Sequence, residues 1–543
     1  MGKYTLGLDF GTLSGRALLL DALTGREVAV ASCTYSHGVM DTALEDGTPL
    51  PPLFALQHPS DYLEVLRVTI PEVLRRAGIT AEEVVGIGVD FTSCTLLPVD
   101  RDGAPLCLLP AFQGEPHAYV KLWKHHAAQP EADLINEVAA TVAPELLKNY
   151  GGRISCEWAL PKILETLRHA PDVFEATYRF MEAGDWISLV LTGEESHAAG
   201  FAGFKFLWNT EEGFPTDRLL TAIDPRLCGL FGSRVSADVR PVREIAGRIS
   251  ADGARLTGLC KGTPVALPLI DAFAPSPALS VTEPNTMLMS IGTSAVQIVH
   301  AEEKRSIPGI CGVAKESVIP SLYTYEAGQT GVGDSFDWFV HNCVPKSYMT
   351  EAEESGMNIH ALLRERASRL RVGESRLLAL DWINGSRPLQ DADLSCMILG
   401  LTLRTRPEEI YRALIEATAF GLRSILENFE ANGLPIRHLF ATGGIAKKDA
   451  MLMQIYADVC ARPIRVAVTE EGPARGSAIY AAVAADLYPD VKTASATLAV
   501  NDWIEYEPIR ENVEAYALLY REYRRLHDYF SRENPVMKRL REV

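Results

Sequence analysis

A short hairpin pattern that occurs twice, about half a chain apart, limits what this sequence can fold into. The first copy, Leu8 to Leu18, reads LDFGTLSGRAL, and the second, Met289 to Val299, reads MSIGTSAVQIV. In both copies a strand-like run ends in Gly-Thr with a serine close by, and a second strand-like run follows. The two Gly-Thr pairs are 281 residues apart in a chain of 543, the spacing that two homologous domains would give. We therefore expect two related domains with a cleft between them.

The residues around the first copy predict an α/β domain. Three strands joined by short turns come first, then a helix, then another strand, with predicted bounds 4–10, 16–21, 27–35, 59–77 and 84–91. A three-stranded meander followed by a helix and a strand is the unit that actin-like ATPase domains repeat. Strands and helices also alternate in many other α/β folds.

The second half contains further helices and strands. We place the domain boundary near residue 265, before an apolar strand, and so predict domains 1–264 and 265–543. A long helix over 407–431 and a strand over 439–442 follow. A last helix, 514–530, could pack on its own domain or mediate a homodimer. We expect it to pack on its own domain.

A Gly-Thr turn between two strands can bind phosphate. Its backbone N–H groups and hydroxyls point into one concavity, so Gly11-Thr12 and Gly292-Thr293 could hold an ATP tail from opposite sides. Asp9, directly before the first turn, suits such a site only with Mg²⁺ between it and the phosphates. The alternative for a single turn is an ordinary hairpin with a glycine at positive φ. The duplication favours the phosphate site.

Two later glycine-containing segments could form the rest of a nucleotide site. The run Ala441 to Lys448, ATGGIAKK, lies between a strand and a helix, where open α/β sheets bind ligands. Paired glycines let a base or ribose approach the backbone, although they also occur in plain tight turns. Around Gly476 an Ala-rich helix begins, and we expect close helix packing there in preference to ligand contact.

Asp271 is the candidate general base. It ends the apolar strand Val265 to Ile270 and begins a turn of small residues, so its side chain is expected at the cleft. A carboxylate suffices as proton acceptor when a metal and backbone dipoles stabilise the transferred phosphoryl group. The competing interpretation is a helix N-cap, a common role for an Asp at a strand end.

Charge and cysteine usage exclude several other functions. A formal charge of -18 without a basic run argues against binding to nucleic acid. The 10 cysteines are scattered singly, without the spacing of a disulfide framework or a zinc site, which fits a reducing cytosol. The amino terminus lacks a signal-peptide pattern, and no apolar run is long enough for a membrane helix. We expect a cytoplasmic protein with neither nucleic acid nor membrane as a partner.

Together these motifs resemble the FGGY family of carbohydrate kinases, which includes glycerol kinase, gluconokinase, xylulokinase and ribulokinase. Both phosphate turns and the Gly443-Gly444 motif recur in order, and the resemblance covers nearly the whole chain. It implies two actin-like (ribonuclease H-like) ATPase domains with an interdomain catalytic cleft, using ATP and Mg²⁺ to phosphorylate a sugar alcohol group.

Within that family the sequence is most similar to the L-ribulokinase branch. The segments that carry this likeness include Val89 to Thr95, Leu122 to Lys124, Tyr150 to Gly152, Gly184 to Trp186, Ile310 to Gly312, Glu326 to Gln329, and Leu380 to Arg387, whereas Ser155 to Lys162 is typical of the whole family. The likeness implies conversion of L-ribulose to L-ribulose 5-phosphate, a step of L-arabinose catabolism.

The resemblance also implies roles for individual residues. Asp271 would be the catalytic base, and Asp9 would hold Mg²⁺ through water. Sugar contacts would come from Ser93, Lys205, Asp271 and Glu326; nucleotide contacts would come from Asp9, Gly11, Thr12, Ser14, Arg16, Gly292, Thr293, Gly443, Gly444 and Lys447. From the residues alone, Lys205 could equally be a solvated lysine and Glu326 a surface carboxylate.

Two segments depart from the ribulokinase pattern, and a proline in the strand before Asp271 is a further unusual feature. Phe273 stands where a His is common, and the turn after Asp271 contains Pro275 and Pro277, which lack backbone N–H donors. His125 stands where an Asp is more usual, so an acidic sugar contact or a structural pair could be lost. Pro268 interrupts the strand before Asp271, which a sheet edge or a bulge would tolerate.

These departures leave alternatives open. A kinase for another ketopentose or pentitol, such as D-ribulose, xylulose or ribitol, differs only in a few hydrogen bonds. A regulatory protein that binds nucleotide and sugar but transfers phosphate weakly is a second alternative. A chaperone-type ATPase is less compatible, because no separate peptide-binding β-domain follows the second half.

Overall fold

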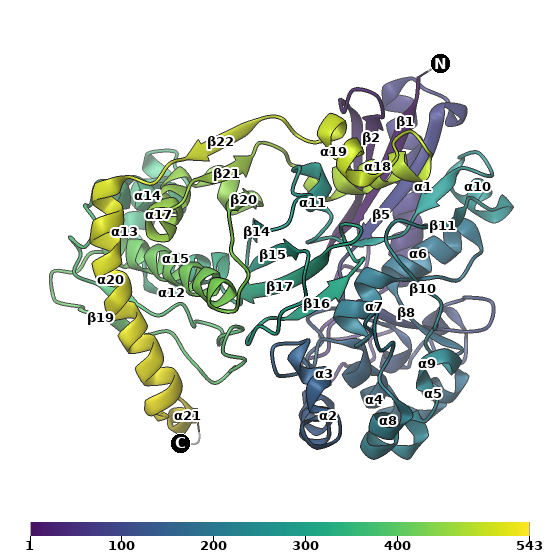
Figure 1. The fold of residues 1–543 in the computed structure, drawn as a ribbon, viewed down its shortest axis with the longest axis horizontal. Coiled ribbons are helices and arrows are strands. Elements are labelled where there is room, and N and C mark those ends of the chain that lie inside the picture. Colours follow the sequence, from purple (N-terminus) through teal and green to yellow (C-terminus); the bar gives the residue numbers. More distant parts are fainter. Residues whose placement is uncertain (1, 542–543) are drawn as a thin grey trace.

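The computed structural model describes residues 2–541, which form two halves, each built around a seven-stranded sheet (Figure 1). In the first sheet the order is β11-β12-β5-β1-β2-β3, with β13 also paired to β5. Its strands are β1 (Tyr4–Phe10), β2 (Ser14–Asp21), β3 (Glu27–Thr34), β5 (Val84–Phe91), β11 (Ile245–Arg248), β12 (Pro264–Ala266) and β13 (Leu269–Ile270).

The second sheet has the order β16-β17-β15-β14-β20-β21-β22. Its strands are β14 (Thr286–Ile291), β15 (Ala295–Ala301), β16 (Gly312–Lys315), β17 (Tyr323–Gln329), β20 (His438–Thr442), β21 (Ile464–Ala467) and β22 (Trp503–Tyr506).

The two sheets share one topology. In the first, β1, β2 and β3 pair antiparallel in series, and β5 and then β12 join the other side of β1 in parallel. In the second, β14, β15 and β17 form the antiparallel series, and β20 and then β21 extend it in parallel. The predicted duplication is therefore confirmed as two domains of the same actin-like design.

Several predicted elements occur where their local signals place them. The helix α1 (Pro59–Ala77) starts with proline at its first turn, where the missing N–H costs no bond, and ends at Gly78 in the left-handed conformation. The long helix α15 (Pro407–Ala431) also has its predicted bounds. The last long helix is α20 (Arg510–Asp528), shifted from the predicted 514–530. The fully buried Tyr516 packs α20 on its own domain, and its hydroxyl receives a bond from Arg412 of α15.

The remaining helices cover the sheets or form an added lobe on the first domain. The lobe contains a small sheet of β4 (Leu56–Gln57), β7 (Val120–Lys121), β6 (Leu96–Val99) and β8 (Arg179–Glu182), with α2 (Gln129–Val142) and α4 (Ala159–His169). The helix α6 (Ala183–Thr192) covers the first sheet beside β5 and β11, and α7 (Ala199–Lys205) lies against β16 of the second sheet. The second domain carries α12 (Gly333–Cys343), α14 (Ile359–Ser368), α16 (Gly444–Lys448) and α17 (Ala450–Cys460). Across residues 2–541 no helix combines the length and apolar character needed to cross a membrane.

The predicted strand 265–270 belongs to the first sheet. It is split into β12 and β13, and both pieces run parallel to β5. Pro268 lies between the two pieces, where no ladder N–H is required. Because β14 starts the second sheet, we propose a domain boundary between Ile270 and Thr286 in place of 264/265.

A helix that follows the strands β14 to β21 of the second sheet packs against the first sheet. The yellow α18 (Gly472–Ala484) lies beside the purple strands β1 and β5 in Figure 1. Its backbone is so close that a Cβ on Gly7 would lie 1.7 Å from the carbonyl oxygen of Ala474, and one on Gly88 would lie 1.9 Å from that of Ser477. Gly476 is similarly tight against Ala274, at 1.7 Å. The packing interpretation of Gly476 is confirmed, and the two halves of the chain interlock.

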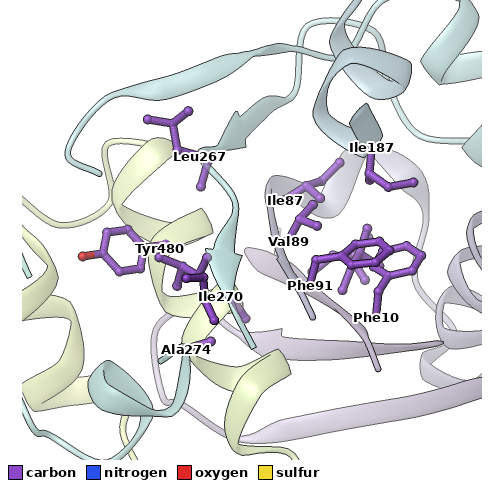
Figure 2. Packing of buried hydrophobic residues seen from close by; sticks show 14 of the residues in the cluster. Phe10, Ile87, Val89, Phe91, Ile187, Leu267, Ile270, Ala274 and Tyr480 are labelled. Atoms are coloured by element: carbon purple, nitrogen blue, oxygen red, sulfur yellow. The ribbon is translucent and has the colours of Figure 1, made fainter. Parts of the chain in front are cut away.

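The core of the first sheet anchors the strand ends. Figure 2 shows Phe10 and Phe91 next to each other, with Ile87 and Val89 along the same strand as Phe91. The two rings stack with centroids 4.9 Å apart and an angle of 9°. Aromatic pairs of this kind add about 0.5–1.5 kcal/mol to the stabilisation from burial. Because Phe10 and Phe91 end β1 and β5, the stack fixes the points where the backbone leaves these two strands.

Candidate active site

Three aspartates meet at the carboxyl ends of neighbouring strands of the first sheet. The β1/β5 register places Asp9 beside Asp90, and Asp271 follows β13 directly, its backbone N–H donating to the carbonyl of Phe91 at 2.9 Å. The pKa of Asp271 is raised to about 7. Burial is the largest cause, and the negative charge of Asp9 is the second. The aspartates are thus close enough to oppose each other's ionisation.

Positive charge at this edge is scarce. Arg16 pairs with Asp9 at 3.1 Å, while Asp90 is fully buried and accepts a bond from the Ser477 hydroxyl at 2.7 Å. Among residues 2–541, the other oxygen of Asp90 has no hydrogen-bond partner. Burial raises the pKa of Asp9, and burial together with the charge of Asp9 raises that of Asp90 far more. Clustered carboxylate oxygens with too few cations are the donor set that a hard divalent ion prefers, so these residues fit Mg²⁺.

Asp90 has no predicted role, although the sequence contains a signal for it. Leu8-Asp9-Phe10 and Val89-Asp90-Phe91 have the same apolar-Asp-Phe pattern at the ends of two strands. Two such strands, paired in parallel, bring their carboxylates to the same edge.

The first Gly-Thr turn is held from outside by side chains of the added lobe. The Trp123 indole N–H donates to the Thr12 hydroxyl at 3.2 Å, and the Gln57 amide donates to the Thr12 carbonyl at 2.7 Å. Tyr62 in turn donates to Gln57 at 2.7 Å. Gln57 and Trp123 had no predicted role, because residues this distant in sequence meet Thr12 only in the fold.

The second Gly-Thr turn rests on the start of α12. It is one residue shorter than the first, since Ile291 pairs with Ala295 where Phe10 pairs with Gly15. The backbone N–H of Gly333 donates to the Gly292 carbonyl at 3.0 Å, and a Cβ on Gly333 would lie only 2.8 Å from that oxygen. The close approach of this helix start was not predicted.

The glycines of the two turns leave open space. Neither Gly11 nor Gly292 has a positive φ, so the ordinary-hairpin interpretation based on backbone conformation is wrong. A Cβ on Gly11 would approach no atom closer than 3.4 Å, and one on Gly292 none closer than 3.9 Å. Nothing in the protein itself therefore requires glycine here. Space above two backbone turns fits the close approach of a ligand, such as phosphate.

The Gly443-Gly444 pair combines a conformational and a spatial role. Gly443 has φ 101° and lies so close to β14 that a Cβ would be 2.4 Å from the Ile291 carbonyl oxygen. A Cβ on Gly444 would meet nothing within 4 Å. Lys447, predicted to bind nucleotide, donates to the backbone carbonyl of Thr469 at 2.8 Å. Gly444 therefore offers the open backbone surface, and Lys447 braces the loop.

Lys205 and Glu326 join the two domains across the cleft. Lys205 ends α7 of the first domain, Glu326 lies in β17 of the second, and their charged atoms are 3.0 Å apart. Burial alone would lower the pKa of Lys205, but the charge of Glu326 outweighs it and the pKa is raised. With side chains 5% and 12% exposed, neither is the solvated surface group of the alternative interpretation. The same two charges act on Asp271.

The turn that contains Ser93 is clamped by two buried side chains of opposite charge. The Glu182 carboxylate accepts the backbone N–H groups of Cys94 and Thr95 at 3.1 and 3.0 Å. The Lys162 ammonium donates to the Cys94 carbonyl at 2.6 Å. Cys94 has φ 58°, a conformation that is costly for residues other than glycine. The clamp offsets this strain and fixes the Ser93 backbone.

Lys162 also connects this turn to the phosphate hairpin. Its ammonium donates to the carbonyl of Leu122 at 2.8 Å, and the next residue, Trp123, reaches Thr12. Both Lys162 and Glu182 have 0% exposure, so neither contacts solvent. They position other groups, and the sequence gives no sign of their partners.

Weakening the clamp should affect the sugar end of the site. We expect Glu182→Gln to raise KM for the sugar about tenfold, because its amide can accept only one of the two N–H groups and a bond to a charged group contributes about 1.5–3 kcal/mol. KM for ATP should hardly change. Steady-state kinetics with each substrate varied separately measures both. Glu131→Gln, at a buried glutamate on α2, is the matched control, and an unchanged sugar KM in Glu182→Gln would contradict the clamp.

Further charged side chains from both domains lie near the Lys205–Glu326 pair. Glu157, which precedes α4, lies 3.2 Å from His126 and 3.9 Å from Arg387 of the second domain. Burial would raise the pKa of Glu157, but His126 and Arg387 together lower it to about 2. Glu157 is therefore ionised across the working range of pH, and charged groups of both domains meet near Lys205.

The departures after Asp271 have structural explanations. Phe273 is 1% exposed and packs edge-on against Phe204, the neighbour of Lys205, with ring centroids 4.8 Å apart. Pro275 is the first residue of the short helix α11 (Pro275–Ala278), where the missing N–H costs no bond. The N-cap of α11 is Ala274, so the N-cap interpretation of Asp271 is wrong. The unusual turn leaves the Asp271 carboxylate available.

His125 belongs to a buried network and not to the cleft. It is 0% exposed and lies 2.9 Å from Glu165, which also accepts a bond from Lys121 at 2.6 Å. Burial lowers the pKa of His125 to about 4 despite the nearby carboxylate. This position therefore contains a structural group, and no acidic sugar contact is expected from it.

Comparison with known proteins agrees with this geometry. The model of the N-terminal domain of the FGGY family of carbohydrate kinases matches residues 4–275, and that of the C-terminal domain matches 287–485. A ribulokinase from Halalkalibacterium halodurans is 46% identical over 546 residues, covering 99% of this chain and 97% of that protein. One from Mycolicibacterium smegmatis is 44% identical over 543 residues, covering 99% and 96%.

Solved structures show the same fold. The xylulose kinase from Rhodospirillum rubrum has a TM-score of 0.81 at 25% identity and covers 99% of this chain and 100% of its own. The gluconate kinase from Lactobacillus acidophilus has a TM-score of 0.79 at 17% identity, covering 98% and 99%.

Proposed function

Because this chain belongs to the FGGY family of carbohydrate kinases, we propose that it transfers the γ-phosphoryl group of ATP to the C5 hydroxyl of L-ribulose, giving L-ribulose 5-phosphate. Full-length similarity to ribulokinases supports this choice of sugar. The structural observation that carries it is the Lys205–Glu326 pair beside Asp271, which provides charged hydrogen-bonding groups from both domains at one point of the cleft. Such a product fits a step of L-arabinose catabolism.

Asp271 is the proposed general base. A base that titrates near neutral pH is both available and able to accept a proton, and the pKa of Asp271 is raised to about 7 by burial and by Asp9. Its carboxylate takes the proton of the C5 hydroxyl as that oxygen attacks the γ-phosphorus. The 2.6 Å bond from the backbone N–H of Ala272 orients the carboxylate.

The phosphate tail lies between the two turns in this proposal. Gly11, Thr12 and Ser14 cradle it from one domain and Gly292-Thr293 from the other, with Arg16 beside Asp9. Asp9 would hold Mg²⁺ through water, with Asp90 beside it in the strand register. When bound, Mg²⁺ neutralises the phosphate charge and orients the γ-phosphoryl group. Gly443 and Gly444 receive the adenosine, and Lys447 supports their loop.

Ser93, Lys205, Asp271 and Glu326 are the proposed sugar contacts. A neutral polyol is selected by several directional hydrogen bonds and not by one strong charge. Because Lys205 and Glu326 come from different domains, a sugar bound to both would hold the cleft closed and exclude water, which limits futile hydrolysis of ATP.

The substrate assignment can be tested directly by coupled ADP release with MgATP. L-ribulose, D-ribulose, D- and L-xylulose, ribitol and glycerol form the panel, and L-ribulose should give the highest kcat/KM. A clear preference for D-ribulose or a pentitol would support the alternative that the protein is a kinase for another ketopentose or pentitol. Turnover with none of the panel would leave only the regulatory protein that binds nucleotide and sugar. Against that alternative stands the meeting of Asp9 and Asp271 at one edge of the first sheet.

The rate should depend on pH through Asp271. We expect kcat/KM for the sugar to fall about tenfold for each pH unit below about 7, because only the deprotonated carboxylate accepts a proton, and its pKa lies near that value. Above the pKa the rate should level off. A pH–rate profile measures this limb, and a flat profile well into the acid range would argue against Asp271 as the titrating base.

The enzyme's setting is also part of the proposal. The 10 cysteines are free thiols, two of them exposed, which suits a reducing cytosol. ATP and the sugar are its proposed partners. A homodimer remains a prediction, and α20 is engaged with its own domain.

A further inference from the structure

A second group of metal-ligating side chains lies apart from the aspartates of the cleft. His37, Glu45 and His58 each place a ligand atom within 4.8 Å of the other two. His37 follows β3, Glu45 lies in the loop after it, and His58 is the N-cap of α1. Their sequence spacing has no zinc-site pattern, and only the fold brings them together.

An aspartate orients His37 toward the group. Asp61, which is 5% exposed, lies 2.8 Å from Nδ1 of His37 and also accepts the His37 backbone N–H at 3.1 Å. An ionised carboxylate can only accept, so the His37 proton belongs on Nδ1 and Nε2 faces Glu45, 3.5 Å from its carboxylate oxygen. A carboxylate behind a histidine is the arrangement that fixes the tautomer of metal-ligating histidines.

His58 completes a donor set of two imidazoles and one carboxylate. Its ring stacks on that of His37, with centroids 4.2 Å and planes 21° apart. Because the nitrogen lone pairs lie in the ring planes, one ring must turn for both to bind the same ion. Its Nδ1 accepts a long bond of 3.3 Å from the backbone N–H of Ser60. Ligation through Nε2 moves the ring proton to Nδ1 and gives up this bond, whose length makes the cost small.

The group borders a solvent-connected cavity of about 500 Å³. Its lining includes Glu45, Asp46, His58, Gln113 and Tyr119, so a cation can enter and water can complete the coordination. Imidazole donors favour zinc, nickel and copper over magnesium, whereas the all-oxygen edge around Asp9 favours magnesium. We propose that His37, Glu45 and His58 bind one divalent transition-metal ion of the zinc class, distinct from the Mg²⁺ of the kinase reaction.

Zinc titration of the full-length protein in excess Mg²⁺ tests the proposal. Excess Mg²⁺ occupies the oxygen site, and competition with a chromophoric chelator reports zinc affinity. Glu45→Gln is the principal variant, because its side chain is 69% exposed and the change should not affect folding. We expect one zinc equivalent in the native protein, weakened at least tenfold in Glu45→Gln and about 10- to 100-fold in Asp61→Asn, the usual effect of losing a carboxylate behind a ligating histidine.

His341→Ala is the matched control, since His341 is 68% exposed and lies beside Asp337 at 3.5 Å in a similar histidine–carboxylate pair. It should leave zinc binding unchanged. If Glu45→Gln binds zinc as tightly as the native protein, the ion belongs to other groups, such as the exposed thiols. His37 would then only bridge Asp61 and Glu45 by polar contacts, and the proposal would be wrong. Neither outcome bears on the kinase assignment, because zinc binding is measured without turnover.

Discussion

Asp271→Asn is expected to lower kcat by about 100- to 10,000-fold, the usual contribution of a general base. The amide is nearly the same size as the carboxylate but cannot take the proton of the attacking hydroxyl. Sugar binding should persist, since Ser93, Lys205 and Glu326 remain. Folding should not suffer, because the substitution removes a buried charge that Asp9 opposes. Single-turnover kinetics and calorimetric titration with the sugar separate the two effects.

A control substitution of a buried aspartate outside the site shows whether loss of a buried charge by itself lowers kcat. Asp458 is 2% exposed and accepts the backbone N–H of Ile509 at 2.7 Å, which ties α17 to the start of α20. Asp458→Asn should keep kcat and lose some thermal stability. Near-normal turnover in Asp271→Asn would remove Asp271 from its proposed role, and so would an unaltered acid limb of the pH profile in that variant.

Gly292→Ala is expected to reduce kcat/KM for ATP about 100-fold, the order of loss that a displacement of about 1 Å in a reacting group can cause. The added methyl occupies the space in which a phosphate would contact the backbone of the second turn. The protein itself has room for it, because the nearest atom would be 3.9 Å away and φ is not positive. Unfolding stability should therefore stay the same or rise by about 0.4–1 kcal/mol.

Unchanged stability together with reduced use of ATP would indicate that a phosphate contacts the backbone of this turn. Gly114→Ala is the matched control, since Gly114 is exposed, lacks a positive φ and would place its Cβ 3.4 Å from the nearest atom. It should affect neither property. Normal kinetics in Gly292→Ala would show that no phosphate approaches this turn, and unfolding of the variant would contradict the open space.

The two predictions separate the parts of the proposed reaction. Asp271→Asn removes proton transfer and leaves both substrates bound, whereas Gly292→Ala disturbs the nucleotide and leaves the base intact. Glu182→Gln in turn shifts sugar affinity without touching either. A variant that altered all three properties together would indicate a general loss of domain packing, such as displacement of α18 from β1, where the two backbones lie very close.

The sequence determined elements whose signals are local. The bounds of β1, β5, α1 and α15 follow from hydrophobic periodicity, proline at a helix start and glycine at its end. The repeated Gly-Thr hairpin predicted two related domains, because each copy is a contiguous segment. Asp9 and Asp271 could be named for the same reason: each directly follows or ends an apolar strand.

The tertiary structure decided everything that depends on residues distant in the chain. The strand before Asp271 joins the first sheet and α18 returns to it, since sheet pairing and helix packing are long-range contacts. The Lys162–Glu182 clamp, the Trp123 bond to Thr12 and the His37 cluster unite residues that no local pattern connects. Burial, which raises the pKa of Asp271 to about 7, is likewise a property of the fold. The sequence names the chemical groups, and only their packing sets the distances and dielectric that give them their reactivity.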